Sequence, residues 1–350
     1  MSEKKPTAEE WGRLYAAARR VKEMAPWEWM MEDEVFGVRN PERDEIGFVS
    51  VMGAAGQHFA VALYQGSDAV YDFIALSEEG SDGQPDRIGA ERLLEIPQLQ
   101  ASFEDRGRLQ KEDRDIIKKL DLKFRGANSW PMFRNYAPGM FPWFLTSSEA
   151  RFLTTALEQL LDVAPRVRDD EDILFGEGDD DFLVRVPRAE KARLVWADKI
   201  VRIPEPEKKK ATPSPLDPQS LESLKKLPEV TNVLEIELTM LPTPVREKKE
   251  RPFFPYMLML AEAQSGMILG NDMLQPLPSL DAMRAEIPIK VAEHLLRLGV
   301  KPLKINVRTE TTAKSLATLA EELGIRIKLS PKLPAIDAAL NFFMERMTPY

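Results

Sequence analysis

Apolar side chains recur every three or four residues in two parts of the first half of the chain. Thr7 and Thr146 precede these stretches, and each is followed three residues later by a glutamate. In such a capping box the first side chain bonds the backbone at the helix start, and the acid bonds back. The pattern therefore predicts amphipathic helices over residues 8–24 and 147–163.

Short apolar runs that end at turn residues predict strands in the rest of this half. These runs cover residues 35–38, 46–52, 58–64, 182–186 and 192–196. The charge-rich segment 89–120 is predicted to be mostly helical, and 129–145 carries too many prolines for regular structure. Residues 1–203 are therefore predicted to form an α+β domain with an antiparallel strand meander and a closing hairpin.

The second half of the chain alternates strand and helix patterns in the order βββαβαβα. The strands cover residues 233–241, 253–263, 267–270, 302–307 and 325–329. Gly299 and Gly324 end the first two helices, since glycine readily adopts the left-handed conformation at a helix C-terminus. The last helix covers about 335–347. This order predicts an α/β domain with a mixed sheet over residues 218–350.

Residues 204–217 separate the two predicted domains. The segment combines four prolines with charged residues and shows no apolar period. Such a composition is typical of a semi-extended linker. All six tryptophans precede it, so the two halves differ in composition as well as in order.

Composition excludes several classes of site. The chain has no cysteine, which rules out disulfides, thiolate nucleophiles and cysteine-ligated metals. His58 and His294 each lie in an apolar run, so both are predicted to be packing residues within a strand or helix. No Gly-x-Ser-x-Gly elbow accompanies them, which disfavours a serine hydrolase.

Charge and hydropathy bear on the partner and the compartment. The net charge of −9 disfavours nucleic acids and anionic membranes as partners, because these are held mainly by basic surfaces. No apolar run reaches the roughly 18 residues of a membrane-spanning helix. A protein partner and a cytoplasmic location are predicted.

The second half resembles the ribonuclease H-like and retroviral integrase-like fold. Three phrases carry the resemblance: Glu237-Leu238-Thr239, residues 263–270 and residues 299–305. The resemblance implies three carboxylates that hold two divalent metal ions. Glu237 stands at the first position, but Arg308 falls at the second, and Asn341 or a neighbour falls at the third. A guanidinium repels metal cations, so a non-catalytic domain is predicted, with Arg308 as a binding residue and no cofactor.

One alternative keeps a catalytic role for this domain. Glu237, Glu262 and Asp272 could converge near the sheet and bind Mg²⁺ or Mn²⁺ in an atypical arrangement. The protein would then be a metal-dependent phosphoryl-transfer enzyme or nuclease. Strand alternation also allows the ordinary interpretation, in which these are surface carboxylates.

The first half resembles a family of uncharacterised bacterial two-domain proteins. The phrases that carry this resemblance lie at residues 25–30, 36–41, 49–53 and 142–143. Aromatic residues in and near them could line a recognition groove, because rigid rings supply contact area at low entropic cost. The candidates are Trp27, Trp29, Trp130, Tyr136 and Trp143. An aromatic core beneath a long loop would use the same residues. The sequence thus predicts a binding or adaptor protein rather than an enzyme.

Overall fold

The computed structural model describes residues 4–79, 87–178, 180–190, 193–206, 216–247 and 250–347. The chain divides into two compact units. Unit 1 comprises Met1–Ala137 and Pro142–Glu207, and unit 2 comprises Pro138–Phe141 and Lys208–Tyr350. Most of the predicted linker, residues 207–215, lies outside the described residues.

Unit 1 is built on a seven-stranded sheet with the order β5-β4-β3-β2-β1-β6-β7. The strands are Phe36–Arg39 (β1), Ile46–Met52 (β2), Ala60–Gln65 (β3), Gln98–Glu104 (β4), Trp130–Tyr136 (β5), Asp181–Glu190 (β6) and Arg193–Arg202 (β7). Neighbouring strands are antiparallel except for β1 and β6, which are parallel. The predicted meander β1-β2-β3 and the predicted hairpin β6-β7 are confirmed.

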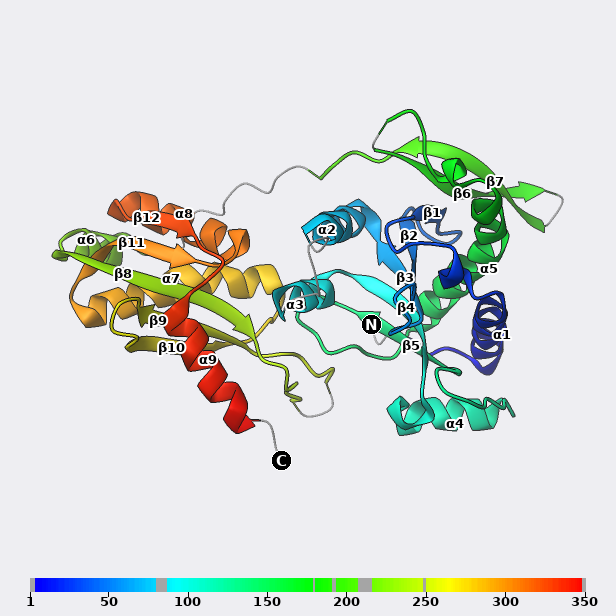
Figure 1. The fold of residues 1–350 in the computed structure, drawn as a ribbon, viewed down its shortest axis with the longest axis horizontal. Helices are drawn as coiled ribbons and strands as arrows, with labels where there is room; N and C mark the ends of the chain where they lie inside the picture. Colours follow the sequence, from blue (N-terminus) through cyan, green and yellow to red (C-terminus); the bar gives the residue numbers. More distant parts are fainter. Residues whose placement is uncertain are drawn as a thin grey trace. The chain divides into compact units, whose positions relative to one another are not determined.

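Helices cover both faces of this sheet (Figure 1). They are Ala8–Met24 (α1), Gly66–Glu79 (α2), Arg87–Glu95 (α3), Lys111–Lys119 (α4) and Ser147–Asp169 (α5). Thr7 and Thr146 form the predicted capping boxes at the starts of α1 and α5. These two helices pack over one face of the sheet, while α2 lies over the other.

The central strands of this sheet are apolar on both faces because both faces are covered. Val49 of β2 and Leu63 of β3 pack against α1 and α5. Their neighbours Phe48 and Tyr64 point to the other face and pack beneath α2. The alternation explains why these strands read as continuous apolar runs in the sequence.

Three sequence predictions for unit 1 are wrong in part. Segment 89–120 contains the strand β4, and segment 129–145 contains the strand β5, although Pro131 lies inside it. β5 is at the edge of the sheet, where a proline costs fewer ladder hydrogen bonds. α5 continues six residues beyond the predicted end and passes through Pro165, because Ala164 and Val167 are buried in the core.

Unit 2 contains a five-stranded mixed sheet with the order β10-β9-β8-β11-β12. The strands are Glu229–Met240 (β8), Tyr256–Glu262 (β9), Ile268–Leu274 (β10), Lys301–Val307 (β11) and Arg326–Leu329 (β12). β9 is antiparallel to both neighbours, and β8, β11 and β12 are parallel to one another. The predicted order of elements, βββαβαβα, is confirmed from β8 onward, and an additional helix, which was not predicted, precedes it at Pro218–Lys225.

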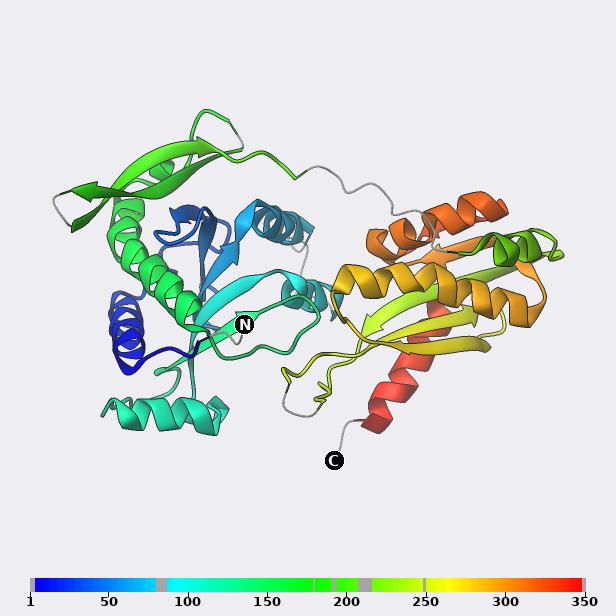
Figure 2. The same cartoon turned by 180° about the vertical axis from the view of Figure 1, so that it is seen from behind.

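The helices of unit 2 lie on opposite faces of its sheet, as the two views in Figures 1 and 2 agree. They are Pro218–Lys225 (α6), Leu280–Leu298 (α7), Glu310–Leu323 (α8) and Pro334–Met347 (α9). α9 packs through Ile336 and Leu340 on Met257, Met259 and Ala261 of β9. α7 and α8 lie over the other face, towards which Leu258 and Leu260 point by alternation.

No helix in the described ranges is long and apolar enough to cross a membrane.

Candidate functional site

A buried ion-pair cluster joins the first strand, the fourth strand and the last helix of unit 2. We name it the Arg308 cluster, and it consists of Glu237 in β8, Arg308 directly after β11 and Asp337 in the first turn of α9. The Nε and Nη2 atoms of Arg308 donate to the two carboxylate oxygens of Glu237 at 3.1 and 2.9 Å. Nη2 also donates to Asp337. One guanidinium therefore lies between two carboxylates.

Two of the three side chains in this cluster are buried. The side chain of Glu237 is 4% exposed and that of Arg308 is 10% exposed, whereas Asp337 is 41% exposed. Burial opposes the charge of Arg308, but the hydrogen bonds to Glu237 and Asp337 outweigh it and raise the pKa of Arg308 above its usual range. The Arg308 Nη1 atom donates to the carbonyl of Pro331 at 2.5 Å, which fixes the guanidinium plane.

Glu235 positions the helix that contributes Asp337. Its Oε2 atom accepts hydrogen bonds from the backbone N–H groups of Ala335 at 2.9 Å and Ile336 at 3.2 Å. These N–H groups have no partner within the helix, and a carboxylate there also complements the helix dipole. Because Glu235 and Glu237 lie two residues apart on β8, they share the sheet face that α9 covers.

The structure does not bring Glu237, Glu262 and Asp272 together. Residues directly opposite in a ladder share a face, and Glu237 is opposite Met259 while Glu262 is opposite Leu234. Asp272 is opposite Leu258, so it also lies on the other face from Glu237. The three carboxylates are therefore divided between the two faces of the sheet.

Glu262 and Asp272 each have local partners. Hydrogen bonds from Ser265, and then from the backbone of Gln264, lower the pKa of Glu262 to about 2. Asp272 bonds the Nε2 atom of His294 at 2.6 Å. His294 is buried in α7, as predicted. Both acids thus stabilise local structure around the edge strand β10.

We next consider metal binding by the side chains in the described part of the chain. No group of three or more histidine, cysteine, aspartate or glutamate side chains there could hold a metal ion. In the Arg308 cluster the guanidinium supplies the positive charge between the carboxylates. Two-metal catalysis needs open acidic ligands around the metal ions. The Arg308 cluster is thus an ion-pair cluster in which a guanidinium lies between two carboxylates.

A cavity of about 520 Å³ opens in unit 1 beside the short helix Pro26–Glu28. It is lined by Trp27, Glu28, Trp29, Met30, Met31, Gly53, Ala54 and Phe59. Two of the five predicted groove residues, Trp27 and Trp29, belong to this lining. Met31, which also belongs to the lining, is 56% exposed. We name the cavity the Trp27 pocket.

A lysine contacts the aromatic rings that line the Trp27 pocket. Trp27 packs against Phe59 and Phe103 with ring centroids 5.1 and 5.5 Å apart. The Lys22 ammonium lies 4.6 Å from the centre of the Phe59 ring and 4.9 Å from that of Trp27. Burial lowers the pKa of Lys22. A Cβ on Gly53 would meet Phe59 at 2.8 Å, so glycine is needed for this close packing.

The other predicted aromatic residues do not line the Trp27 pocket. Trp130 packs on Phe124, and Trp143 packs edge to face on Phe144. The hydroxyl of Tyr136 donates to Gln100 at 2.9 Å, and burial raises the pKa of Tyr136 to about 12. These three residues serve packing in and around the edge strand β5.

The second histidine departs from the prediction. The side chain of His58 is half exposed, and its Nδ1 atom lies 3.9 Å from Glu104. The apolar run that contains it becomes a strand only from Ala60, so His58 lies in the preceding turn. The packing interpretation was therefore right for His294 and wrong for His58.

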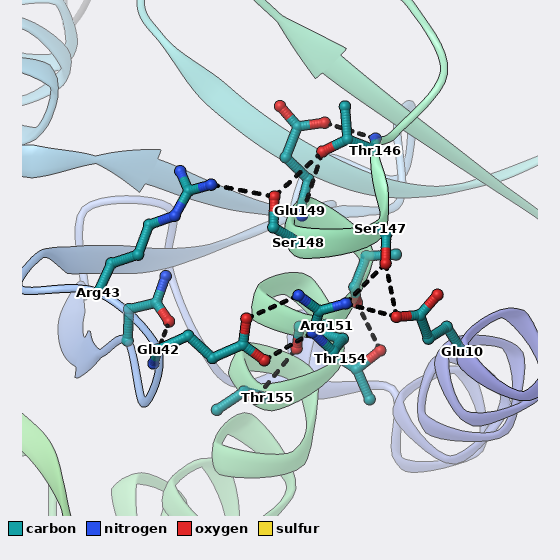
Figure 3. Close-up of polar contacts among 12 residues, drawn as sticks. Glu10, Glu42, Arg43, Thr146, Ser147, Ser148, Glu149, Arg151, Thr154 and Thr155 are labelled. Atoms are coloured by element: carbon teal, nitrogen blue, oxygen red, sulfur yellow. Dashed lines mark hydrogen bonds and ion pairs between the residues drawn. The ribbon is translucent and has the colours of Figure 1, made fainter. Parts of the chain in front are cut away.

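A polar cluster in unit 1 surrounds Arg151 (Figure 3). Arg151 of α5 binds both carboxylate oxygens of Glu42 at 2.6 and 2.7 Å. It also binds Glu10 of α1, which accepts a further hydrogen bond from Ser147 at 2.6 Å. Desolvation opposes ionisation of Glu10, but these bonds and that from Thr7 lower its pKa to about 2. The cluster fastens α1, α5 and the β1-β2 turn together.

Sequence reasoning missed Asp337 and Phe59. Asn341, which was expected near the third position, is exposed on α9. Asp337 lies four residues earlier, one helical turn closer to the helix start, and therefore reaches Arg308. The signal that could have found it is an acid in the first turn of a helix that follows Pro334.

Two family models match the chain, one in each half. The model described as domain of unknown function DUF7309 matches residues 11–185, which is half of the chain. The model described as domain of unknown function DUF6930 matches residues 220–344. No curated protein matches the chain.

Proposed function

Since the chain belongs to the DUF7309 family, whose description names no activity, we propose from its geometry that it is a non-catalytic binding protein. The proposal includes two domains joined by the linker at 204–217 and a cytoplasmic location. The observation that carries it is the Arg308 guanidinium between Glu237 and Asp337.

The order of strands and helices in unit 2 supports the resemblance to the ribonuclease H-like fold. In that comparison the first strand, the end of the fourth strand and the last helix supply the acids. Glu237, Arg308 and Asp337 occupy these three places. A metal ion would have to enter against the positive charge of Arg308 and displace it from two carboxylates. The cluster therefore stabilises unit 2 instead of activating water.

The binding surface that we favour is the Trp27 pocket. Its walls are aromatic rings and methionines, which provide contact area for a partner's side chains. Glu28 in the lining and the net charge of −9 favour a protein over a nucleic acid. In unit 2, Arg308 serves the fold rather than a partner, because its donors are already engaged.

Metal-dependent stabilisation tests this proposal. Wild-type protein should show no change in the melting temperature of unit 2 with Mn²⁺, and no Mn²⁺-dependent cleavage of single- or double-stranded nucleic acid. Arg308→Asp places a third acid beside Glu237 and Asp337, so Mn²⁺ should stabilise this variant. At a Mn²⁺ concentration of about 100 times the dissociation constant, the gain is about 2.7 kcal/mol.

The matched control is Arg308→Lys, which keeps the positive charge and should not respond to Mn²⁺. Nucleic acid cleavage by the wild type that disappears in Glu237→Gln would establish an enzyme and overturn the proposal.

A further inference from the structure

Four strands lie at sheet edges in the two units, namely β5 and β7 in unit 1 and β10 and β12 in unit 2. An edge strand presents unpaired N–H and C=O groups that can pair with another chain, and proteins usually block such edges. Proline, a bulge, charged side chains, a short strand or a covering segment can each serve this purpose.

Three of the four edges are blocked by such features. β5 contains Pro131, and its outer side exchanges two backbone hydrogen bonds between Asn135 and Trp143, at 2.8 and 2.9 Å. β10 is irregular at its start, where the register shifts between Ile268 and Gly270. β12 is only four residues long and carries exposed Arg326 and Lys328.

β7 differs from the other three edges. It is ten residues long, has no proline and pairs with β6 along its whole length without a register shift. Within the described ranges, no segment pairs with its outer side. Leu194, Val195 and Ile200 are 52%, 42% and 49% exposed. β7 also carries the exposed charged residues Lys199 and Arg202, but it is longer and more regular than β12 and presents three exposed aliphatic side chains, which suits it to adding a strand.

We propose that β7 pairs antiparallel with β7 of a second copy of this chain, so that the two unit 1 sheets become continuous. Two residues directly opposite each other in an antiparallel ladder form one of two kinds of pair. Either both point their N–H and C=O groups towards the other strand, or both point them away from it. A symmetric pair of identical strands must therefore be centred on a residue. Centring on Ala197 sets Leu194 opposite Ile200.

This register suits the side chains of β7. The exposed Leu194 and Ile200 lie on one face of the strand, so each copy covers the exposed aliphatic side chain of the other. Val195 faces the aliphatic stem of Lys199 on the opposite face. Centring on Asp198 instead would set two carboxylates against each other, and centring on Trp196 would set Leu194 against Asp198. Centring on Ala197 sets Asp198 against Trp196, but of these three registers only this one matches Leu194 with Ile200, so the pattern of exposed aliphatic side chains selects a second copy in the register about Ala197.

The pairing does not depend on the proposed function, and its expected strength is modest. One strand from each copy buries less than the roughly 1,600 Å² of a standard interface. We therefore expect a dimer with a dissociation constant on the order of 10 µM. The three exposed aliphatic side chains contribute most of the buried apolar surface.

Sedimentation velocity of the full chain from about 1 to about 100 µM tests the proposal. The average mass should rise from one chain to two. Leu194→Lys should remain a monomer and shift the dissociation constant by at least tenfold. Met267→Lys is the matched control, because Met267 is 58% exposed in the β9-β10 turn, and it should dimerise like the wild type. Far-UV circular dichroism verifies that both variants are folded.

The absence of cysteine allows a test of the register. Directly opposite Cβ atoms lie about 4.5–5.5 Å apart, close to the span of a disulfide. Ala197→Cys should therefore form a disulfide-linked dimer under mild oxidation at least tenfold faster than Ser223→Cys, an exposed position on α6. A mass of one chain up to 100 µM, or equal dimerisation of Leu194→Lys, would overturn the proposal. Equal crosslinking of the two cysteine variants would overturn the pairing about Ala197.

Discussion

Removing Arg308 should destabilise unit 2 by about 3 kcal/mol, the lower part of the range measured when one partner of a buried ion pair is removed. In Arg308→Ala the carboxylate of Glu237, 4% exposed, would remain buried and would lose the guanidinium that balances its charge. Asp337 is 41% exposed and can be solvated, so the loss of its contact adds about 0–1 kcal/mol. The main cost therefore comes from Glu237.

Urea unfolding can separate the two units because all six tryptophans lie in unit 1. With a slope of about 2 kcal/mol per M, a loss of 3 kcal/mol lowers the urea midpoint by about 1.5 M. Far-UV circular dichroism should show this shift for unit 2, while tryptophan fluorescence keeps its midpoint. Arg326→Ala, an exposed arginine on β12, is the control and should shift neither signal.

A second variant isolates the reason for the loss. The pair of substitutions Glu237→Leu and Arg308→Leu removes both buried charges, and replacing a buried ion pair by apolar residues is often neutral. This double variant should recover most of the midpoint lost in Arg308→Ala. If the urea midpoint of Arg308→Ala lies within about 0.3 M of the wild-type midpoint, removal of Arg308 does not cost the free energy of unfolding that we expect.

Three further predictions concern other packed or charged residues. The pKa of Glu10 is lowered from 4.5 to about 2, so its stabilising effect is present above pH 4.5 and is lost as the pH falls towards 2. Between pH 6 and pH 3 the free energy of unfolding of unit 1 should therefore fall by about 1–2 kcal/mol less in Glu10→Gln than in the wild type, as measured by tryptophan fluorescence. Gly53→Ala should destabilise unit 1 by about 1–3 kcal/mol and alter the fluorescence of Trp27, since glycine has φ of 134° and a Cβ there would contact Phe59; an unchanged melting curve would contradict this. Gly270→Ala should destabilise unit 2 by a similar amount in a thermal melt, because its Cβ would overlap the ring of His294.

Sequence patterns predicted the elements whose local signals agree with their tertiary environment. The capping boxes located the starts of α1 and α5, and apolar period and glycine stops predicted the order of unit 2 from β8 onward but not the helix α6 before it. β5 was missed because Pro131 locally disfavours a strand, whereas pairing with β4 along its full length stabilises one. The end of α5 was missed for a related reason, since burial of Val167 stabilises helix beyond Pro165.

The candidate site was predictable only in part. The resemblance directed attention to Glu237 and Arg308, which the structure joins in one ion pair. The contact with Asp337 depends on how α9 crosses the sheet, which no local pattern encodes. The Trp27 pocket likewise needs Phe59, a residue 32 positions away that reaches Trp27 only after β2 and β3 have paired.

The cap that Glu235 provides has a consequence for the order in which unit 2 folds. The first turn of α9 obtains two of its hydrogen bonds from a carboxylate 100 residues earlier in the chain. That carboxylate is in place only when β8 has joined the sheet, so α9 should dock after the sheet has formed. Until then Met257 and Met259 face solvent, which makes the nascent sheet prone to self-association. Amide exchange at Ala335 and Ile336 therefore reports the closing step of folding in this unit.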